Sequence, residues 1–145
     1  MKIVVQRVNQ ASVSVSEKVV GEIGKGVVVL LGVTNFDTKE NADYLVKKLV
    51  DLRIFEDENG KLNFSLRDIN GELLVVSNFT LYADCQHGNR PSFKDAAKPD
   101  LAEGLYNYFL EKCKSLLPVV KEGVFGSHMQ VSLINDGPVT IVIEC

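Results

Sequence analysis

The stretch Lys2-Ile-Val-Val-Gln-Arg-Val-Asn-Gln-Ala-Ser-Val-Ser-Val-Ser16 is rich in β-branched residues. Its second half alternates apolar with polar residues, because Ala11, Val13 and Val15 are separated by serines. Period-two alternation is typical of a strand with one buried face. The stretch therefore predicts a long strand at the start of the chain.

Two apolar runs, Val19 to Ile23 and Gly26 to Val33, follow this strand. The dipeptide Gly24-Lys25 separates them, and a short glycine turn between two apolar runs is typical of a hairpin. The second run has no alternation, so we expect it to be buried on both faces. The first third of the chain is predicted to be antiparallel sheet.

The rest of the chain predicts helices and strands in a mixed order. Apolar residues recur at helical spacing from about 37 to 53, after candidate N-cap residues, and again from Pro99 to just before Pro118. Residues 73–81 read as a central strand, and residues 82–98 as a loop long enough to be functional. In the tail, alternation at 129–133 and an apolar run at 139–143 predict two strand-like pieces.

Bulk properties narrow the classes of protein. The chain has 145 residues, 46% of them hydrophobic, which indicates one folded domain over residues 1–145. The net charge of −3 and pI near 5.4 have the wrong sign for gripping long stretches of phosphate backbone, so a nucleic acid would be held locally. Arg90, Lys94 and Lys98 form a modest basic segment, which a solvated surface explains well.

The three cysteines are Cys85, Cys113 and Cys145, widely spaced and without a CxxC pair. We expect neither a disulfide framework nor a zinc site. The chain shows no charged-then-apolar leader and no apolar run long enough to span a bilayer, which favours a cytoplasmic location.

Serine and threonine hydroxyls are the candidate side-chain nucleophiles. Ser77 and Thr80 lie on one predicted strand, and His87 and His128 are the only candidate histidine bases. Ser77 lacks the glycines of a G-x-S-x-G elbow, and neither histidine has a flanking acid. The sequence therefore does not favour a catalytic triad.

The Gly137-Pro138 step allows an unusual backbone. Glycine tolerates rare dihedrals, and the bond before proline is cis in about one folded case in twenty. By itself Asn-Asp-Gly-Pro favours an ordinary tight turn between two strands.

Six segments in order resemble the D-aminoacyl-tRNA deacylase family, also called D-tyrosyl-tRNA deacylase. They are Val5-Gln-Arg-Val8 with Ala11-Ser-Val13, Leu30-Leu-Gly-Val33, Arg53-Ile-Phe55, Ser77-Asn-Phe-Thr-Leu81, Gly88-Asn-Arg-Pro-Ser-Phe93 and Met129-Gln-Val-Ser-Leu-Ile-Asn-Asp-Gly-Pro-Val-Thr140. The resemblance covers the whole chain. With the patterns above, it predicts a homodimer of single α+β domains, each with an antiparallel, barrel-like sheet core and two main helices.

The resemblance implies hydrolysis of the ester that joins a D-amino acid, or glycine, to the 3′ adenosine of tRNA. No cofactor is expected, and no residue is expected to be a metal ligand. The Gly-Pro step, here Gly137-Pro138, is expected to be cis and to reach into the partner's site, where its carbonyl oxygens hold the amino group and its bulk rejects L side chains. The tRNA 2′-hydroxyl is expected to help activate water, with backbone N–H donors near Phe79 and Thr80.

The family resemblance also implies roles for individual residues. Ser77, Asn78, Phe79 and Thr80 correspond to the family's catalytic segment, with Asn78 where most members carry Gln. Gln6 and Arg7 are expected to brace the Gly-Pro corner. Phe125, Gly126 and Met129 are expected near the pocket for the terminal adenine.

Two alternatives stay open at this point. One is a small-ester hydrolase that uses Ser77 or Thr80 as the nucleophile. The other is a non-catalytic RNA-binding homologue that has kept the fold, which the Asn78 departure allows.

Overall fold

The long first strand organises the sheet. In the computed structural model, which describes residues 1–145, β1 (Lys2–Val15) pairs along one edge with β8 (Gln130–Glu144). Its other edge pairs with β2 (Lys18–Ile23) and β3 (Gly26–Gly32). The predicted N-terminal strand and the antiparallel first third are confirmed.

The predicted hairpin at Gly24-Lys25 is wrong. β2 and β3 do not pair with each other; both run antiparallel to β1, with Ile23 opposite Ala11 and Gly26 opposite Val8. Both pairs belong to one continuous antiparallel register. β2 and β3 therefore follow one another along the same edge of β1, without a reversal between them. The reversal occurs earlier, at Ser16 and Glu17, which both have positive φ.

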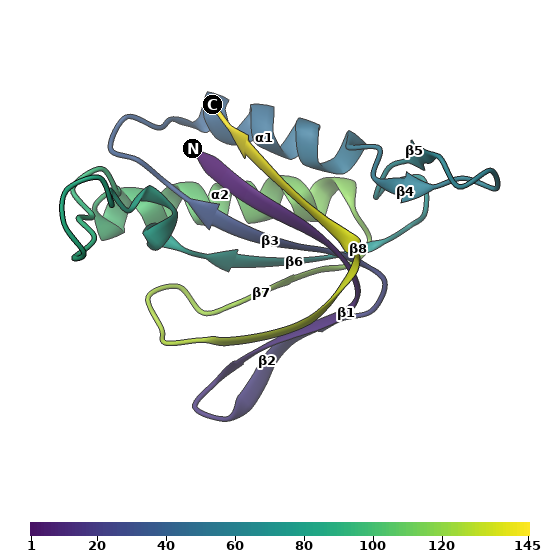
Figure 1. The fold of residues 1–145 in the computed structure, drawn as a ribbon, viewed down its shortest axis with the longest axis horizontal. Helices are drawn as coiled ribbons and strands as arrows, with labels where there is room; N and C mark the ends of the chain where they lie inside the picture. The colour runs from purple at the N-terminus through teal and green to yellow at the C-terminus, as the bar shows by residue number, and fades with distance from the viewer.

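The predicted α+β class, with a barrel-like sheet and two main helices, is confirmed. The sheet is mixed rather than purely antiparallel. β6 (Glu72–Ser77) pairs parallel with β3, and β7 (Val120–Glu122) pairs parallel with β6. β2 curls toward β7, and a Cβ on Gly21 would lie 2.9 Å from the Glu122 carbonyl oxygen. The sheet is thus nearly closed into a barrel (Figure 1).

The two helices cover one face of this sheet (Figure 1). They are α1 (Lys39–Asp51) and α2 (Pro99–Leu116), close to the predicted ranges, with Pro99 in the first turn of α2. A small sheet of β4 (Phe55–Glu56) and β5 (Leu62–Phe64) follows α1. Neither α1 nor α2 combines the length and the apolarity that a membrane-crossing helix needs.

Apolar residues on both faces of β6 are buried. Leu73 and Val75 belong to a cluster of 23 residues between the sheet and the helices, whereas Leu74 and Val76 belong to a cluster of seven inside the barrel. This explains why β3 and β6 read as continuous apolar runs rather than alternating ones.

The predicted strand over residues 73–81 ends early. β6 stops at Ser77, and Phe79–Tyr82 form one 3-10 turn, η1. The Asn78 side chain accepts a hydrogen bond from the Thr80 N–H and so caps this turn at 3.1 Å. Asparagine at an N-cap competes with continued strand structure.

The tail contains one strand where two pieces around a tight turn were expected. β8 pairs with β1 on both sides of Gly137-Pro138, and the bond between these two residues is cis. Gln6 is opposite Thr140 and Val8 is opposite Asn135, so residues 136–139 bulge out opposite Arg7 alone. The chain direction does not reverse there.

Candidate active site

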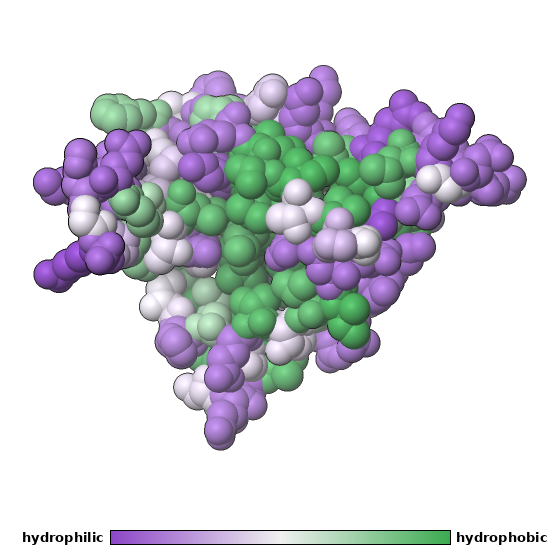
Figure 2. Space-filling model, in the orientation of Figure 1, coloured by the Kyte–Doolittle hydropathy of each residue, from purple (hydrophilic) through white to green (hydrophobic).

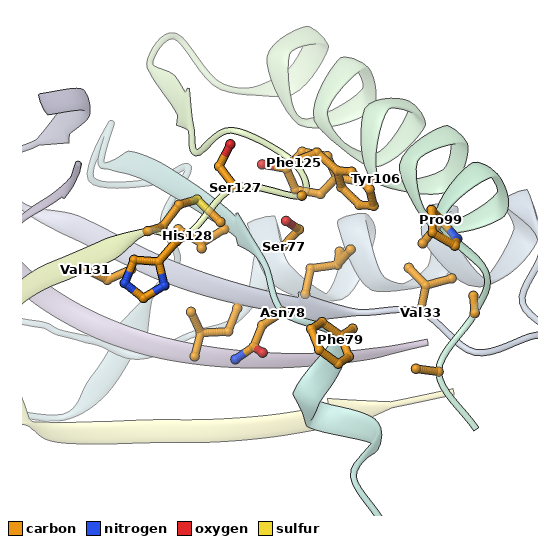
Figure 3. Close-up of a pocket in the computed structure, with 18 of the residues that line it drawn as sticks. Val33, Ser77, Asn78, Phe79, Pro99, Tyr106, Phe125, Ser127, His128 and Val131 are labelled. Atoms are coloured by element: carbon orange, nitrogen blue, oxygen red, sulfur yellow. The ribbon is translucent and has the colours of Figure 1, made fainter. Parts of the chain in front are cut away.

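A cavity of about 860 Å³ opens where β6 ends. Its walls come from β3, the start of α2, the loop before α2 and residues 125–133 (Figure 3). Fourteen of its 21 lining residues are hydrophobic, and a few polar groups, including Ser77 and Asn78, lie among them. An apolar cavity with few polar groups is typical of a small-molecule or terminal-group site.

The η1 turn places the Ser77–Thr80 segment at this cavity. The Asn78 N–H donates to the Leu31 carbonyl at 2.8 Å, which ties the segment to β3. Gly32 permits the close approach, because a Cβ there would lie 3.0 Å from the Leu81 Cβ. The cavity is thus positioned by backbone contacts between two central strands and one turn.

The Thr80 hydroxyl is held by Asn78. It donates to the Asn78 Oδ1 atom, which also accepts from the Thr80 N–H. An amide oxygen is no base, so this partner does not activate the hydroxyl for nucleophilic attack. Thr80 does not line the cavity.

Phe79 is the first residue of η1, so its N–H has no acceptor within the turn. The residue is 58% exposed, and its ring packs edge-on against Phe93, with ring centroids 5.1 Å apart. Both rings line the cavity. A free N–H beside an apolar cavity is a suitable donor to a developing oxyanion.

Tyr106 forms part of the wall near Phe125, with ring centroids 5.8 Å apart (Figure 3). Its hydroxyl donates to the Val75 carbonyl at 2.9 Å. Burial, and then the nearby Glu122 charge, raise the pKa of this hydroxyl above its ordinary value. Tyr106 is therefore a neutral wall residue rather than an acid or base.

Gln6 and Arg7 contact the strand that carries the bulge. Arg7 is buried and donates from Nε to the Asp136 carbonyl at 3.0 Å, and from Nη1 to the Ile54 carbonyl at 2.7 Å. Gln6 donates to the Thr140 hydroxyl at 3.3 Å. The Asn135 side chain accepts from the Val139 N–H at 3.0 Å, which closes the bulge from within.

The structure brings together seven of the eleven residues expected at the site. These are Gln6, Ser77, Asn78, Phe79, Phe125, Gly126 and Met129, which all line the cavity. The other four, Arg7, Thr80, Gly137 and Pro138, do not line the cavity of their own chain. Gly137 and Pro138 are both exposed on the bulge.

Sequence reasoning missed several lining residues. Ala96, Ala97 and Ala102 leave room for the cavity, and no pattern distinguishes such small residues from ordinary helix and loop positions. His128 was expected to be a surface residue, and it is exposed but also lines the cavity (Figure 3). His87 does not line it.

Known proteins resemble this chain over almost its full length. The model of the family described as D-Tyr-tRNA(Tyr) deacylase matches residues 4–144. A D-aminoacyl-tRNA deacylase of Clostridium acetobutylicum is 56% identical over 144 residues, which cover 99% of this chain and 97% of that protein.

Two solved structures are similar in fold. A protein described as c-Myc DNA Unwinding Element Binding Protein is 45% identical with a TM-score of 0.95, and the match covers 100% of this chain and 99% of that one. A probable eukaryotic D-amino acid tRNA deacylase has a TM-score of 0.86 at 18% identity, covering 98% and 97% of the two chains, which shows likeness of fold alone.

Proposed function

The chain belongs to the D-Tyr-tRNA(Tyr) deacylase family, and from this premise we propose that it hydrolyses the ester of D-aminoacyl-tRNA at the cavity beside η1. The products are free tRNA and the D-amino acid. The observation that carries the proposal is the position of the Ser77–Thr80 segment, which places a backbone donor beside an apolar cavity.

The chemistry needs no side-chain nucleophile. An aminoacyl ester is already reactive, so positioning it against backbone donors supplies much of the acceleration. The Phe79 N–H is the donor that the turn leaves unsatisfied. The tRNA's own 2′-hydroxyl helps to activate the attacking water, and this agrees with a Thr80 hydroxyl that is occupied by Asn78.

Chiral selection is assigned to the bulge of a second copy. Gly137 and Pro138 are exposed and lie outside their own chain's cavity, while Arg7 and Asn135 hold the bulge in place. In a homodimer the two carbonyl oxygens would hold the substrate's amino group, and the backbone would leave no room for an L side chain. Glycine has no side chain, so this backbone would not exclude a glycyl substrate.

The face along β8 supports a contact between two copies. β8 pairs on only one of its edges, and its Ile134 and Val142 side chains are 51% and 60% exposed. Figure 2 shows apolar residues gathered on this face, where β8 and β1 lie in Figure 1, with hydrophilic residues around them. A long unpaired edge beside an apolar patch is typical of an interface.

Incubation with D-Tyr-tRNA and L-Tyr-tRNA tests the activity. We expect release of D-tyrosine and intact L-Tyr-tRNA, in a cytoplasmic role that clears wrongly charged tRNA. Equal hydrolysis of the two substrates, or none, would overturn the proposal.

A mixing experiment tests whether the bulge acts across subunits. The variant Pro138→Ala removes ring bulk, so we expect it to gain activity on L-Tyr-tRNA. The variant Ala102→Trp fills the cavity of its own chain but keeps a native bulge. Co-expression with excess Ala102→Trp should restore L-Tyr-tRNA rejection to the Pro138→Ala subunits. Unchanged hydrolysis of L-Tyr-tRNA in the mixed dimers would show that the bulge does not act across subunits.

The second candidate function is nucleic-acid binding without turnover, which the name of the 45% identical protein favours. The net charge of −3 argues against tight binding of long duplex DNA. Binding of D-Tyr-tRNA that leaves its ester intact would support this candidate over the deacylase.

A further inference from the structure

Phe36 stands out among the exposed apolar residues. Its side chain is 92% exposed, more than that of any other large hydrophobic residue in the chain. It lies in the turn between β3 and α1, where its N–H donates to the Thr34 hydroxyl at 3.2 Å. The ring contributes almost no burial to the fold, so nearly all of its surface is free to contact another molecule.

The turn that carries Phe36 is joined to the loop before α2. The Ala97 N–H donates to the Val33 carbonyl at 2.9 Å, and Thr34 and Ala96 form a β-bridge. The Asn35 side chain donates to the Lys94 carbonyl at 3.4 Å. The turn and the loop therefore lie at one end of the molecule (Figure 1).

This end borders the cavity. Val33, Ala96 and Ala97, which make the contacts just described, all line it. Phe36 lies three residues beyond Val33, and Lys94 and Lys98 flank the two alanines. Phe36, Lys94 and Lys98 are thus carried by backbone that borders this edge of the cavity, although none of the three lines it.

Lys94 and Lys98 are exposed, and neither forms any of the chain's ion pairs. Asp95 and Asp100 alternate with them in the sequence, so the segment is not a strong single-sign patch. Figure 2 shows hydrophilic residues at this end of the molecule, with pale green apolar residues among them. Such a surface suits a few local phosphate contacts better than a long duplex.

We infer that Phe36, Lys94 and Lys98 form a docking surface for the single-stranded 3′ end of tRNA, just before the aminoacylated nucleotide. The inference rests on the proposed function. A terminal nucleotide that enters the cavity across this edge would bring the preceding unpaired nucleotides against Phe36, Lys94 and Lys98. Bases of any sequence stack on an aromatic ring, and ammonium groups contact phosphates, so many tRNAs are accepted alike.

The experiment compares a full substrate with a truncated one. D-Tyr-tRNA carries the preceding nucleotides, whereas D-tyrosyl-adenosine carries only the group that enters the cavity. For Phe36→Ala we expect kcat/KM on D-Tyr-tRNA to fall roughly 5- to 100-fold, mainly through KM, because stacking of one base on an aromatic is lost. Activity on D-tyrosyl-adenosine should be unchanged.

The lysines are tested through salt dependence. For the double variant Lys94→Ala, Lys98→Ala, the slope of log kcat/KM on D-Tyr-tRNA against log salt should become shallower by about 1.4, which is two phosphate contacts at about 0.7 each for a single strand. The matched controls are Lys61→Ala in the β4–β5 connection and Val19→Ala on β2, both on exposed residues away from the cavity. Both controls should behave as the unaltered protein does.

The outcomes separate this inference from the function on which it rests. If the unaltered protein hydrolyses neither substrate, the deacylase proposal fails. The other case is that the unaltered protein hydrolyses both substrates. If the variants then lose activity equally on the two substrates, or on neither, only the proposed docking surface is overturned. A Phe36→Ala protein that sediments as a monomer where the unaltered protein is a dimer would assign the ring to a contact between copies, and would also overturn it.

Discussion

The buried Arg7 guanidinium donates to the Asp136 carbonyl at 3.0 Å, one residue before Gly137. The same side chain donates to the Ile54 carbonyl at 2.7 Å, after α1. One residue of β1 therefore connects the bulge of β8 to the segment that leads into the β4–β5 sheet. The bulge is fixed by a buried side chain rather than by the regular ladder, which is interrupted there.

Replacing Arg7 with Met should loosen this bulge. The variant keeps the apolar stem but leaves one buried and one partly buried carbonyl group without a donor, which costs about 2–4 kcal/mol of unfolding free energy. We expect urea unfolding to show this loss, and D-Tyr-tRNA hydrolysis to fall with it. The matched control is Asp136→Asn, which keeps the carbonyl acceptor and removes only the carboxylate, 3.3 Å from Arg7 Nε and 40% exposed. A control that loses as much stability as Arg7→Met would assign the effect to the ion pair.

Asn78 should act through the η1 turn. In Asn78→Ala the Thr80 N–H and hydroxyl lose their shared acceptor, and loss of an N-cap costs about 0.5–2 kcal/mol. We expect kcat on D-Tyr-tRNA to fall about tenfold with little change in KM, because the Phe79 N–H is displaced. Restored kcat in Asn78→Gln, the residue that the family resemblance leads us to expect at this position, would show that either amide can hold the turn. Unchanged kcat in Asn78→Ala would contradict this positioning role.

Thr80→Val tests the hydroxyl itself. Valine keeps the branched shape and removes a hydroxyl that donates only to Asn78. We expect D-Tyr-tRNA hydrolysis to stay within about tenfold of the unaltered rate, since a lost nucleophile usually costs far more. A loss of several orders of magnitude, with the fold intact by circular dichroism, would instead support the small-ester hydrolase with a Thr80 nucleophile.

Much of the fold follows from the sequence because β-branched alternation and helical spacing are strong local signals. The first strand and both helices were predicted to within a few residues. The error at Gly24-Lys25 has a physical cause: a glycine between two apolar runs looks the same whether the chain reverses or continues. The chain continues rather than reverses because β1 is 14 residues long. Its edge opposite β8 can therefore pair with β2 and β3 in succession.

The site was less accessible to sequence reasoning. Phe79 and Thr80 favour strand structure by propensity, and the Asn78 cap overrides them. The alanines of the cavity wall carry no signal, because a cavity is made by what neighbouring side chains do not fill. The segment resemblance located seven cavity residues, and it implied that Gly137-Pro138 serves the partner's site, as their position outside their own chain's cavity allows.

Cysteine reactivity offers a check on the core. Cys113 is fully buried in α2, and burial raises the pKa of its thiol to about 12, whereas Cys85 and Cys145 are exposed. Because the thiolate is the reactive form, a thiol reagent at pH 8 should modify two cysteines in the folded protein and the third only after unfolding in urea. Rapid modification of all three would show that α2 opens readily.

Alkaline pH should weaken the fold through Tyr106. Its folded pKa is raised, so its contribution to stability is complete below the unfolded value near 10 and is lost as pH rises above it.

The variant Tyr106→Phe removes this titration but also the hydrogen bond to Val75, which costs about 1 kcal/mol at neutral pH. Urea unfolding at pH 7 and pH 11 should therefore show a stability gap between the two proteins that narrows at pH 11. Tyr82 and Cys113, whose pKa values are also raised, should leave a residual alkaline loss in the variant. A gap that widens at pH 11 would mean that Tyr106 ionises more easily folded than unfolded, and its hydroxyl would then become a candidate acid in the cavity.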